Sequence, residues 1–280
     1  MPVSKEPTVT TSLDTSRLHF KNTASTPGRT CSVSPDNSQL THLHYGRIRL
    51  GPDQPEVRFE THGRETALIC LSGSCSLMVS GTRETLAQYD SIYIPRGSLV
   101  EVQSPTGVDL VECSSLVEGD YPLQVVRYPD VVRDPSLHFT AGGEATTREL
   151  NILIGKNVKA GRIVAGFTRS MPGHWTSWPP HEHAALLEEM YVYFDMPAPA
   201  FGVQFVYDDA ETPEFAGIVR DGDAVVMPQG FHPNVSIPGH PIHFVWLMAA
   251  RREVEDRVFG VVNVQPDFRQ GGSGLEAGRR

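Results

Sequence analysis

The chain has 280 residues, with 24 Lys and Arg against 33 Asp and Glu, so its formal net charge at pH 7 is −9. Hydrophobic residues make up 39% of it, and 25 Gly and 22 Pro provide for many turns. This composition excludes a collagen, a coiled coil and a wholly disordered chain. The acidic balance argues against nucleic-acid or anionic-membrane partners.

The chain shows no sign of export or membrane insertion. Its longest strongly apolar stretch, Phe244 to Ala250, is far shorter than the roughly 20 residues of a membrane helix, and the polar start has no apolar region typical of a secretory signal. The four cysteines form no CxxC pair and no disulfide framework. We therefore expect a soluble protein of the reduced cytoplasm.

Residues 1–40 are rich in Ser, Thr and Pro and lack periodicity, which predicts a flexible arm. From Tyr45 onward, short β-forming runs alternate with Gly, Pro and Asp at the spacing of about 8–12 residues that is typical of all-β sandwiches and barrels. The clearest expected strands are Ala67–Leu71, Ser76–Val79, Ser91–Ile94, Val108–Glu112, Glu149–Ile154, Arg162–Thr168, Met190–Phe194, Val203–Tyr207, Ala224–Met227 and Ile242–Met248. No helix longer than two turns is expected.

The two halves of the chain resemble each other. Tyr89–Val100 (YDSIYIPRGSLV) and Asp221–Pro233 (DGDAVVMPQGFHP) each contain an acidic turn, a buried-looking strand and then Pro-x-Gly. A repeat of one β-domain explains this similarity. We expect two tandem β-barrels at 41–135 and 136–268, followed by a flexible tail at 269–280.

Three histidines of the second half are candidates for a metal site. His181 and His183 are one residue apart, so in an extended segment both imidazoles point to the same face. His232 follows the second Pro-x-Gly turn, where a later strand could bring it to the same place. With a carboxylate, three imidazoles suit Zn, Mn, Fe, Ni or Co, and zinc is our first candidate.

The carboxylate is either Glu188 or Glu189, which directly precede the next predicted strand. Glu189 shares strand parity with Tyr191 and Tyr193, which would give that face a polar lining. Glu188 shares parity with residues suited to packing. We prefer Glu189 as the fourth ligand.

A second HxH pair, His42 and His44, has no nearby carboxylate downstream. The first Pro-x-Gly turn leads to Ser98 and Leu99 and lacks a histidine. We interpret this pair as structural or surface residues, and we expect the N-terminal barrel to lack metal ligands.

Several strings of the second half carry a family resemblance: GHWTSWPPHEH, EEMYVYF, FGVQFVYDD and DGDAVVMPQGFHP. They resemble the 5-deoxy-glucuronate isomerase family of myo-inositol catabolism, a branch of the cupin superfamily, and its sister, the 5-keto-4-deoxyuronate isomerase family of pectin breakdown. The spacing within both metal motifs departs from the general cupin pattern. The resemblance is dense over 162–250 and implies a bicupin of jelly-roll barrels. It also implies one divalent ion in the second barrel, on His181, His183, Glu189 and His232.

By this resemblance the reaction is an aldose–ketose isomerisation of a sugar acid, 5-deoxy-glucuronate to 5-dehydro-2-deoxy-gluconate. The alternative substrate is 5-keto-4-deoxyuronate (4-deoxy-L-threo-5-hexosulose-uronate). Such a reaction needs a Lewis acid at the carbonyl and a group that moves a proton between neighbouring carbons. Our candidates for that group are Tyr191 and Tyr193 with metal-bound solvent, and Glu182 is a further one.

An arginine matches the two oxygens of a substrate carboxylate, and Arg162, Arg169 and Arg220 are the candidates. Gln204 could bind substrate hydroxyls, and Trp178 could either line the pocket or pack in the core.

Two other functions fit the same ligands: a cupin dioxygenase that uses iron or nickel, and a non-catalytic sugar-binding bicupin. Pairing through exposed sheet edges favours a homo-oligomer.

Overall fold

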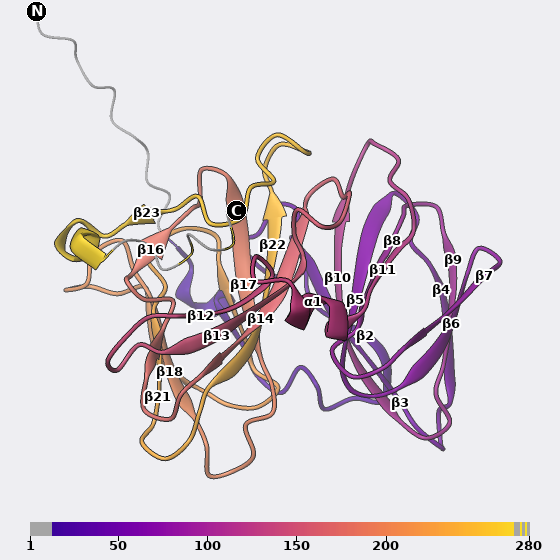
Figure 1. Ribbon diagram of the computed structural model, residues 1–280, viewed down its shortest axis with the longest axis horizontal. Helices are drawn as coiled ribbons and strands as arrows, with labels where there is room; N and C mark the ends of the chain where they lie inside the picture. The colour runs from indigo at the N-terminus through magenta and orange to yellow at the C-terminus, as the bar shows by residue number, and fades with distance from the viewer. Residues whose placement is uncertain (1–12, 272–274, 276–277, 279–280) are drawn as a thin grey trace, which may run out of the picture.

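A computed structural model describes residues 13–271, 275 and 278 (Figure 1). The expected all-β class is confirmed, and a strand lies at each of the ten places where the sequence predicts one. The one α-helix of the described residues is α1 (Tyr128–Arg133), and two short 3-10 helices lie at Thr15–Arg17 and Pro266–Gly271. No helix of this part of the chain is long and apolar enough to cross a membrane.

The first half of the chain forms a barrel of two antiparallel sheets (Figure 1). The larger sheet has the order β11 (Gln124–Val126), β8 (Ser91–Ile94), β5 (Arg64–Gly73), β10 (Val108–Leu116), β3 (His44–Leu50) and β2 (Gly28–Val33). The smaller sheet has the order β4 (Glu56–Glu60), β9 (Leu99–Gln103), β6 (Cys75–Val79) and β7 (Thr82–Leu86). Along β6 every second side chain is buried between the sheets, which is the expected period of two.

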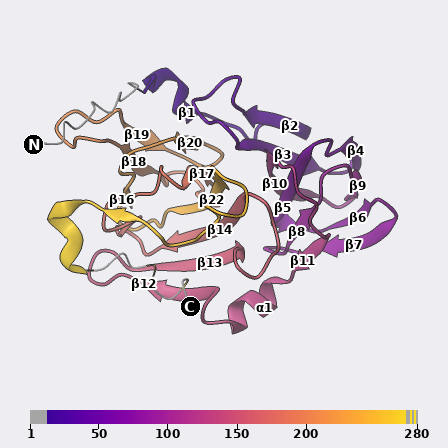
Figure 2. The same cartoon turned by 90° about the horizontal axis from the view of Figure 1, so that it is seen from above.

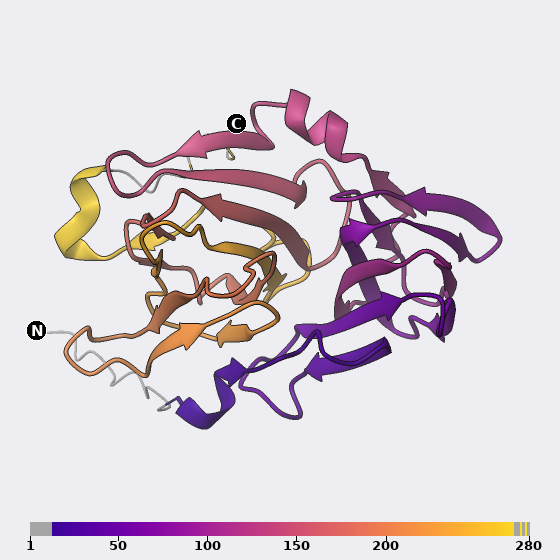
Figure 3. The same cartoon turned by 90° about the horizontal axis from the view of Figure 1, so that it is seen from below.

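The second half forms a similar barrel beside the first (Figures 2 and 3). Its larger sheet has the order β1 (His19–Phe20), β20 (Ala224–Met227), β17 (Leu187–Tyr193), β22 (His243–Ala250), β14 (Ile163–Ser170), β13 (Arg148–Ile154) and β12 (His138–Ala141). Its smaller sheets are β15 (Trp175–Thr176), β21 (Asn234–Ser236), β18 (Gly202–Val206) and β19 (Phe215–Val219), and the pair β16 (His181–Glu182) and β23 (Asn263–Val264). β17 is buried along its whole length, as expected of a central strand covered on both faces.

The N-terminal segment differs from the flexible arm expected over 1–40. In its described part, β1 pairs with β20 of the second barrel and β2 pairs with β3 of the first. The side chain of Asp223 holds β1 in place, because its carboxylate lies 3.2 Å from His19 Nε2 and accepts the backbone N–H of Asn22 at 3.1 Å. Residues 1–12 lie outside the described part.

The predicted tail also contributes to the packing at one described position. Leu275 is 8% exposed and packs in a small apolar cluster with Ala141 and Leu150 of the second barrel. Leu275, within the range 269–280 for which a flexible tail is predicted, therefore packs against the second barrel.

Two fully buried glutamates join the barrels. Glu188 on β17 of the second barrel accepts three consecutive backbone N–H groups of residues 41–43, at 2.7–2.8 Å. Glu65 on β5 of the first barrel accepts three consecutive N–H groups of residues 161–163 at the same distances, and the hydroxyl of Tyr93 at 2.6 Å. Each barrel thus satisfies backbone N–H donors of the other with the hydrogen bonds of a buried carboxylate. We call Glu65 and Glu188 the glutamate clamp.

Candidate active site

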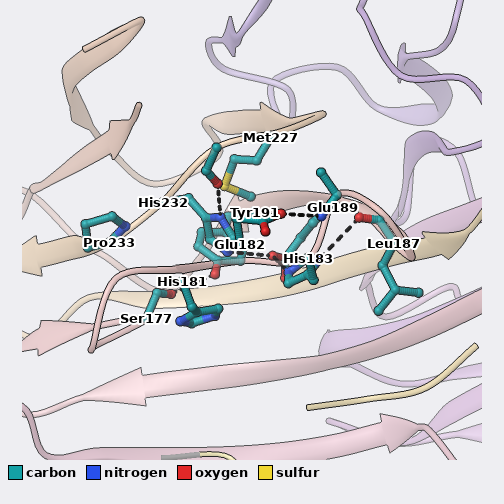
Figure 4. A network of polar contacts seen from close by, with 12 residues as sticks. Ser177, His181, Glu182, His183, Leu187, Glu189, Tyr191, Met227, His232 and Pro233 are labelled. Carbon is teal, nitrogen blue, oxygen red and sulfur yellow. Dashed lines mark hydrogen bonds and ion pairs between the residues drawn. The ribbon is translucent and has the colours of Figure 1, made fainter. Parts of the chain in front are cut away.

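Three histidines of the second barrel meet at one point (Figure 4). His181 belongs to β16, His183 follows it directly, and His232 lies between β20 and β21. Each offers a ligating nitrogen, and these atoms all lie within 4.8 Å of one another. The three residues are 6%, 6% and 2% exposed, so the group is shielded from solvent.

Backbone carbonyls orient all three imidazoles. The Nδ1···O distances are 2.8 Å to Pro179, 3.1 Å to Leu187 and 2.9 Å to Gly230 for His181, His183 and His232 in turn. A carbonyl only accepts, so Nδ1 carries the proton in each ring and Nε2 is left as the ligand atom. The buried Nε2 of His232 makes no well-directed hydrogen bond, although a carboxylate oxygen of Glu189 lies beside it, which is what a metal ligand would show before the ion binds.

Glu189 completes the group. Its Oε2 lies 3.0 Å from Nε2 of His183 and 3.1 Å from Nε2 of His232, and the residue is 1% exposed. Burial alone would raise the pKa of Glu189, but these two histidines outweigh it and lower the pKa to about 2. Burial, followed by the neighbouring histidines, lowers the pKa of His181 to about 3. An ionised carboxylate beside a neutral imidazole is the donor chemistry that a divalent metal prefers.

The neighbouring Glu188 points to the other face of β17, into the glutamate clamp. Of the two glutamates, the structure therefore brings Glu189 to the histidines. The other HxH pair lies at the barrel junction, where Nδ1 of His44 is 3.2 Å from the carbonyl of His42. In the described ranges, the cluster of three histidines is the only group of His, Cys, Asp and Glu close enough to hold a metal.

A cavity opens beside this group. Its polar lining consists of Arg148, Thr168, Ser177, His181, Glu189 and Tyr191, and its apolar lining includes Phe244 and Trp246. The hydroxyl of Tyr191 lies 2.7 Å from Oγ of Ser177. Burial and then the charge of Glu189 raise the pKa of Tyr191 well above its ordinary value, so this hydroxyl keeps its proton. A protonated hydroxyl at this position can donate a hydrogen bond to a ligand.

Comparison with known proteins decides the family. The model of the KduI/IolB family matches residues 18–261. The chain belongs to the KduI/IolB family. A 5-deoxy-glucuronate isomerase of Geobacillus thermodenitrificans is 28% identical over 241 residues, covering 79% of this chain and 85% of the relative. A 4-deoxy-L-threo-5-hexosulose-uronate ketol-isomerase of Kineococcus radiotolerans is 29% identical over 226 residues, covering 75% and 77%. The chain is therefore an isomerase of the KduI/IolB family.

Solved structures agree on the fold. An IolB-like protein of Salmonella typhimurium has a TM-score of 0.78 at 20% identity and covers 90% of this chain and 98% of its own. Oxalate decarboxylase of Bacillus subtilis has a TM-score of 0.59 at 14% identity and covers 88% and 78%. The tandem cupin arrangement that the sequence predicts is confirmed.

In this KduI/IolB-family chain, the predicted site residues Tyr193 and Gln204 form hydrogen bonds that hold the backbone of His232. Tyr193 donates its hydroxyl to Oε1 of Gln204 at 2.5 Å, and Asn234 donates to the same oxygen at 3.1 Å. The amide nitrogen of Gln204 donates to the backbone carbonyl of His232 at 3.0 Å. Neither Tyr193 nor Gln204 lines the cavity, so both differ from the roles in proton transfer and hydroxyl binding that were predicted for them.

The three predicted carboxylate-binding arginines lie away from the cavity. Arg162 donates to backbone carbonyls at the barrel junction, Arg169 lies 4.7 Å above the ring of Tyr89, and Arg220 is exposed. None of these three side chains lines the cavity, since each guanidinium is held by, or lies over, groups outside it. The arginine that does line the cavity is Arg148, which the sequence patterns did not single out.

Trp178 and Glu182 also lie outside the cavity lining. The ring of Trp178 packs at 5.2 Å from Trp175 and 5.0 Å from Phe268. Glu182 accepts the N–H of its neighbour Ala184 at 2.9 Å. Trp178 therefore takes the packing alternative left open by the sequence, and Glu182 faces away from the histidines.

Proposed function

We propose that this isomerase is metal-dependent and converts 5-deoxy-glucuronate to 5-dehydro-2-deoxy-gluconate, a step of myo-inositol catabolism. One divalent ion, zinc first among the candidates, would bind to His181, His183, His232 and Glu189. The single observation that carries the proposal is the convergence of three buried imidazoles, each with its Nδ1 held by a backbone carbonyl, with the buried carboxylate of Glu189 beside two of them.

A divalent ion bound there supplies a Lewis acid that polarises the carbonyl and the adjacent hydroxyl of the substrate. The chain's own residues do the rest. Tyr191, protonated and held by Ser177, donates a hydrogen bond to a substrate oxygen as its charge grows. Tyr193 and Gln204 keep the backbone of His232 in place. Tyr191 and Tyr193 thus take different roles: Tyr191 donates to the substrate and Tyr193 supports the backbone of His232.

A second substrate has specific support. The relative from Kineococcus radiotolerans is named a 4-deoxy-L-threo-5-hexosulose-uronate ketol-isomerase, and it is as similar in sequence as the first-named relatives. Both candidate substrates are six-carbon sugar acids that undergo the same type of isomerisation. The substrate assay therefore includes both of them.

The test is a product assay on purified protein with each of the two substrates, before and after metal removal and reloading. We expect activity that follows the metal content and that disappears in the double variant His181→Ala, His183→Ala. The matched control is His42→Ala, His44→Ala, which removes the HxH pair outside the site and should keep both metal and activity. Oxygen consumption with substrate would instead favour the dioxygenase alternative. Saturable sugar-acid binding without turnover would favour the binding protein.

The family implies a small-molecule substrate. A homo-oligomeric state and a cytoplasmic location stay predictions from the sequence, to be measured by light scattering and by fractionation.

A further inference from the structure

The cavity beside the histidines, which we call the site cavity, is too small for a sugar acid. Its volume is about 40 Å³, which holds about three water molecules. Sites for small molecules typically have about 300–1,000 Å³, so a six-carbon substrate enters only if part of the wall moves. Most of the lining residues lie on strands, whose ladders hold them in place. Phe259 and Leu275 instead come from the segment after β22 and lie outside the strands.

A second cavity adjoins the first at Phe259, which lines both. We call it the outer cavity, and its volume is about 250 Å³. Strands β13 and β14 extend from one cavity to the other. Their residues Leu150 and Thr168 line the site cavity, and Ile152 and Val164 line the outer cavity. The ring of Phe259 therefore lies between two spaces within the same barrel.

The outer cavity reaches the surface of the molecule. Lys156, Val258 and Val261 belong to its lining, and all three are exposed. If the ring of Phe259 moved aside, the two cavities would join, and their combined space would approach the lower end of the range for small-molecule sites. This gives a route from solvent to the histidine group.

The contacts of Phe259 suit a side chain that moves. Its ring stacks on Trp246, with 5.2 Å between the ring centroids and 26° between the planes. Gly260 follows at a φ of 80°, a left-handed conformation that a glycine adopts without strain. The segment is fixed on either side of this point. Before it, Arg257 donates to two backbone carbonyls of the second barrel at 2.8 Å, and after it β23 pairs with β16.

We propose that the outer cavity is the entry site of the substrate and that Phe259 is the gate between this entry site and the histidine group. The inference rests on the proposed function for the identity of the ligand, a sugar acid. Return of the ring after entry would exclude bulk water from the site cavity during the reaction. Phe259 controls access in this scheme and takes no part in the chemistry.

The experiment measures how fast a cysteine in the site cavity reacts with a thiol reagent. Thr168 lines this cavity and is 4% exposed, so Thr168→Cys places a thiol behind the gate. The probe is methyl methanethiosulfonate, which is small and neutral, and the exposed Cys31 of the same chain is the internal reference. Loss of one aromatic contact raises an open population by up to about tenfold. We expect Phe259→Ala to speed the labelling of Thr168→Cys by about that factor and Phe259→Trp to slow it.

The matched control is Phe268→Ala. Phe268 belongs to the same C-terminal segment, but its ring packs on Trp178 and lines neither cavity, so this variant should leave the labelling rate unchanged. The buried Cys70 monitors the fold, and where Phe259→Ala exposes it to the reagent, the smaller change Phe259→Leu takes its place. A labelling rate that does not respond to Phe259 would overturn the gate. Equal acceleration by the variants at 259 and 268 would also overturn it, since the whole segment would then control access.

The labelling needs neither metal nor turnover, so its result is independent of the proposed function. In the isomerase assay, Phe259→Trp should also lower kcat/KM for 5-deoxy-glucuronate, with unchanged metal content. If labelling depends on Phe259 but neither substrate is converted by wild type, the gate stands and the proposed function fails. If Phe259→Trp slows labelling and leaves kcat/KM unchanged, the substrate takes another route and the entry site is overturned.

Discussion

Replacement of Glu188 by alanine removes the acceptor of three buried backbone N–H groups, those of residues 41–43. A buried donor that loses its partner costs about 1–3 kcal/mol, so with three such donors the variant should lose roughly 3–9 kcal/mol of unfolding free energy. Typical domains have about 5–15 kcal/mol in total, so this is a large fraction. Glu65→Ala should lose a similar amount, because it also leaves three backbone donors, and the hydroxyl of Tyr93, without an acceptor.

The same variants separate the two adjacent glutamates. Glu188→Ala should keep its metal, because the side chain points away from the histidines, whereas Glu189→Ala should lose metal and keep most of its stability. Urea unfolding followed by tryptophan fluorescence gives the stability, and elemental analysis gives the metal content. Where alanine at position 188 prevents folding, Glu188→Gln keeps one acceptor oxygen and should show about half the loss. If Glu188→Ala is as stable as wild type, Glu188 is not the acceptor that stabilises the barrel junction. If Glu188→Ala loses metal and Glu189→Ala does not, Glu189 is not the metal ligand.

Three further outcomes follow from single contacts. Burial alone would raise the pKa of Asp223, but the hydrogen bonds from His19 and two backbone amides outweigh burial and lower the pKa. These bonds therefore stabilise the fold above the unfolded pKa of about 3.9, and this stabilisation is lost as the pH falls further. Asp223→Asn should therefore be less stable than wild type in urea at pH 7, and the difference should shrink below pH 4. Burial raises the pKa of Cys70 and Cys75 to about 12 and that of Cys113 well above its ordinary value, while Cys31 is exposed. Mass spectrometry should therefore find iodoacetamide on Cys31 alone in the native protein. Gln204→Leu removes the support behind His232 and should weaken metal affinity by about tenfold, measured by competition with a chelator.

Most of the fold can be predicted from the sequence because the long strands carry their own pattern. β8 and β20 have the predicted bounds, and the other predicted strands differ by a few residues at their ends. The strands that were missed are mostly short, and β1, with two residues, exists because β20 of the distant barrel offers it a partner. Sequence pattern is local, whereas such pairing depends on the tertiary arrangement.

The site residues also divide into those that a local pattern predicts and those that depend on the tertiary arrangement. Strand parity places Glu189 at the histidines, since the alternation of faces along β17 is a local property. Arg148 was missed, although it shares parity with the buried Leu150 and Ile152, because an arginine at a strand start usually faces solvent. Arg162 was one of three candidate arginines, but its guanidinium donates to the carbonyl of Leu116 in the other barrel and to two carbonyls of its own barrel, and no pattern in one segment reports such contacts.

The register of the two sheets shows how the halves correspond. Thr66 pairs with Ile94 on β8, and Glu189 pairs with Met227 on β20. Ile94 and Met227 each stand directly before the proline of a Pro-x-Gly turn. Thr66 and Glu189 therefore occupy the same position in the two barrels.

The residues one place earlier, Glu65 and Glu188, correspond as well, and both are the clamp carboxylates. The contact that joins the barrels is thus present in both copies of the repeat, whereas the candidate ligands are not. Thr66 stands where the second barrel has its ligating glutamate, and Leu99, which is 67% exposed, stands two residues after the glycine of its turn, as the histidine does in the second barrel. A leucine and a threonine cannot replace an imidazole and a carboxylate as metal ligands. The candidate metal ligands therefore lie in the second barrel, whereas both barrels have a buried glutamate that binds backbone N–H groups of the other.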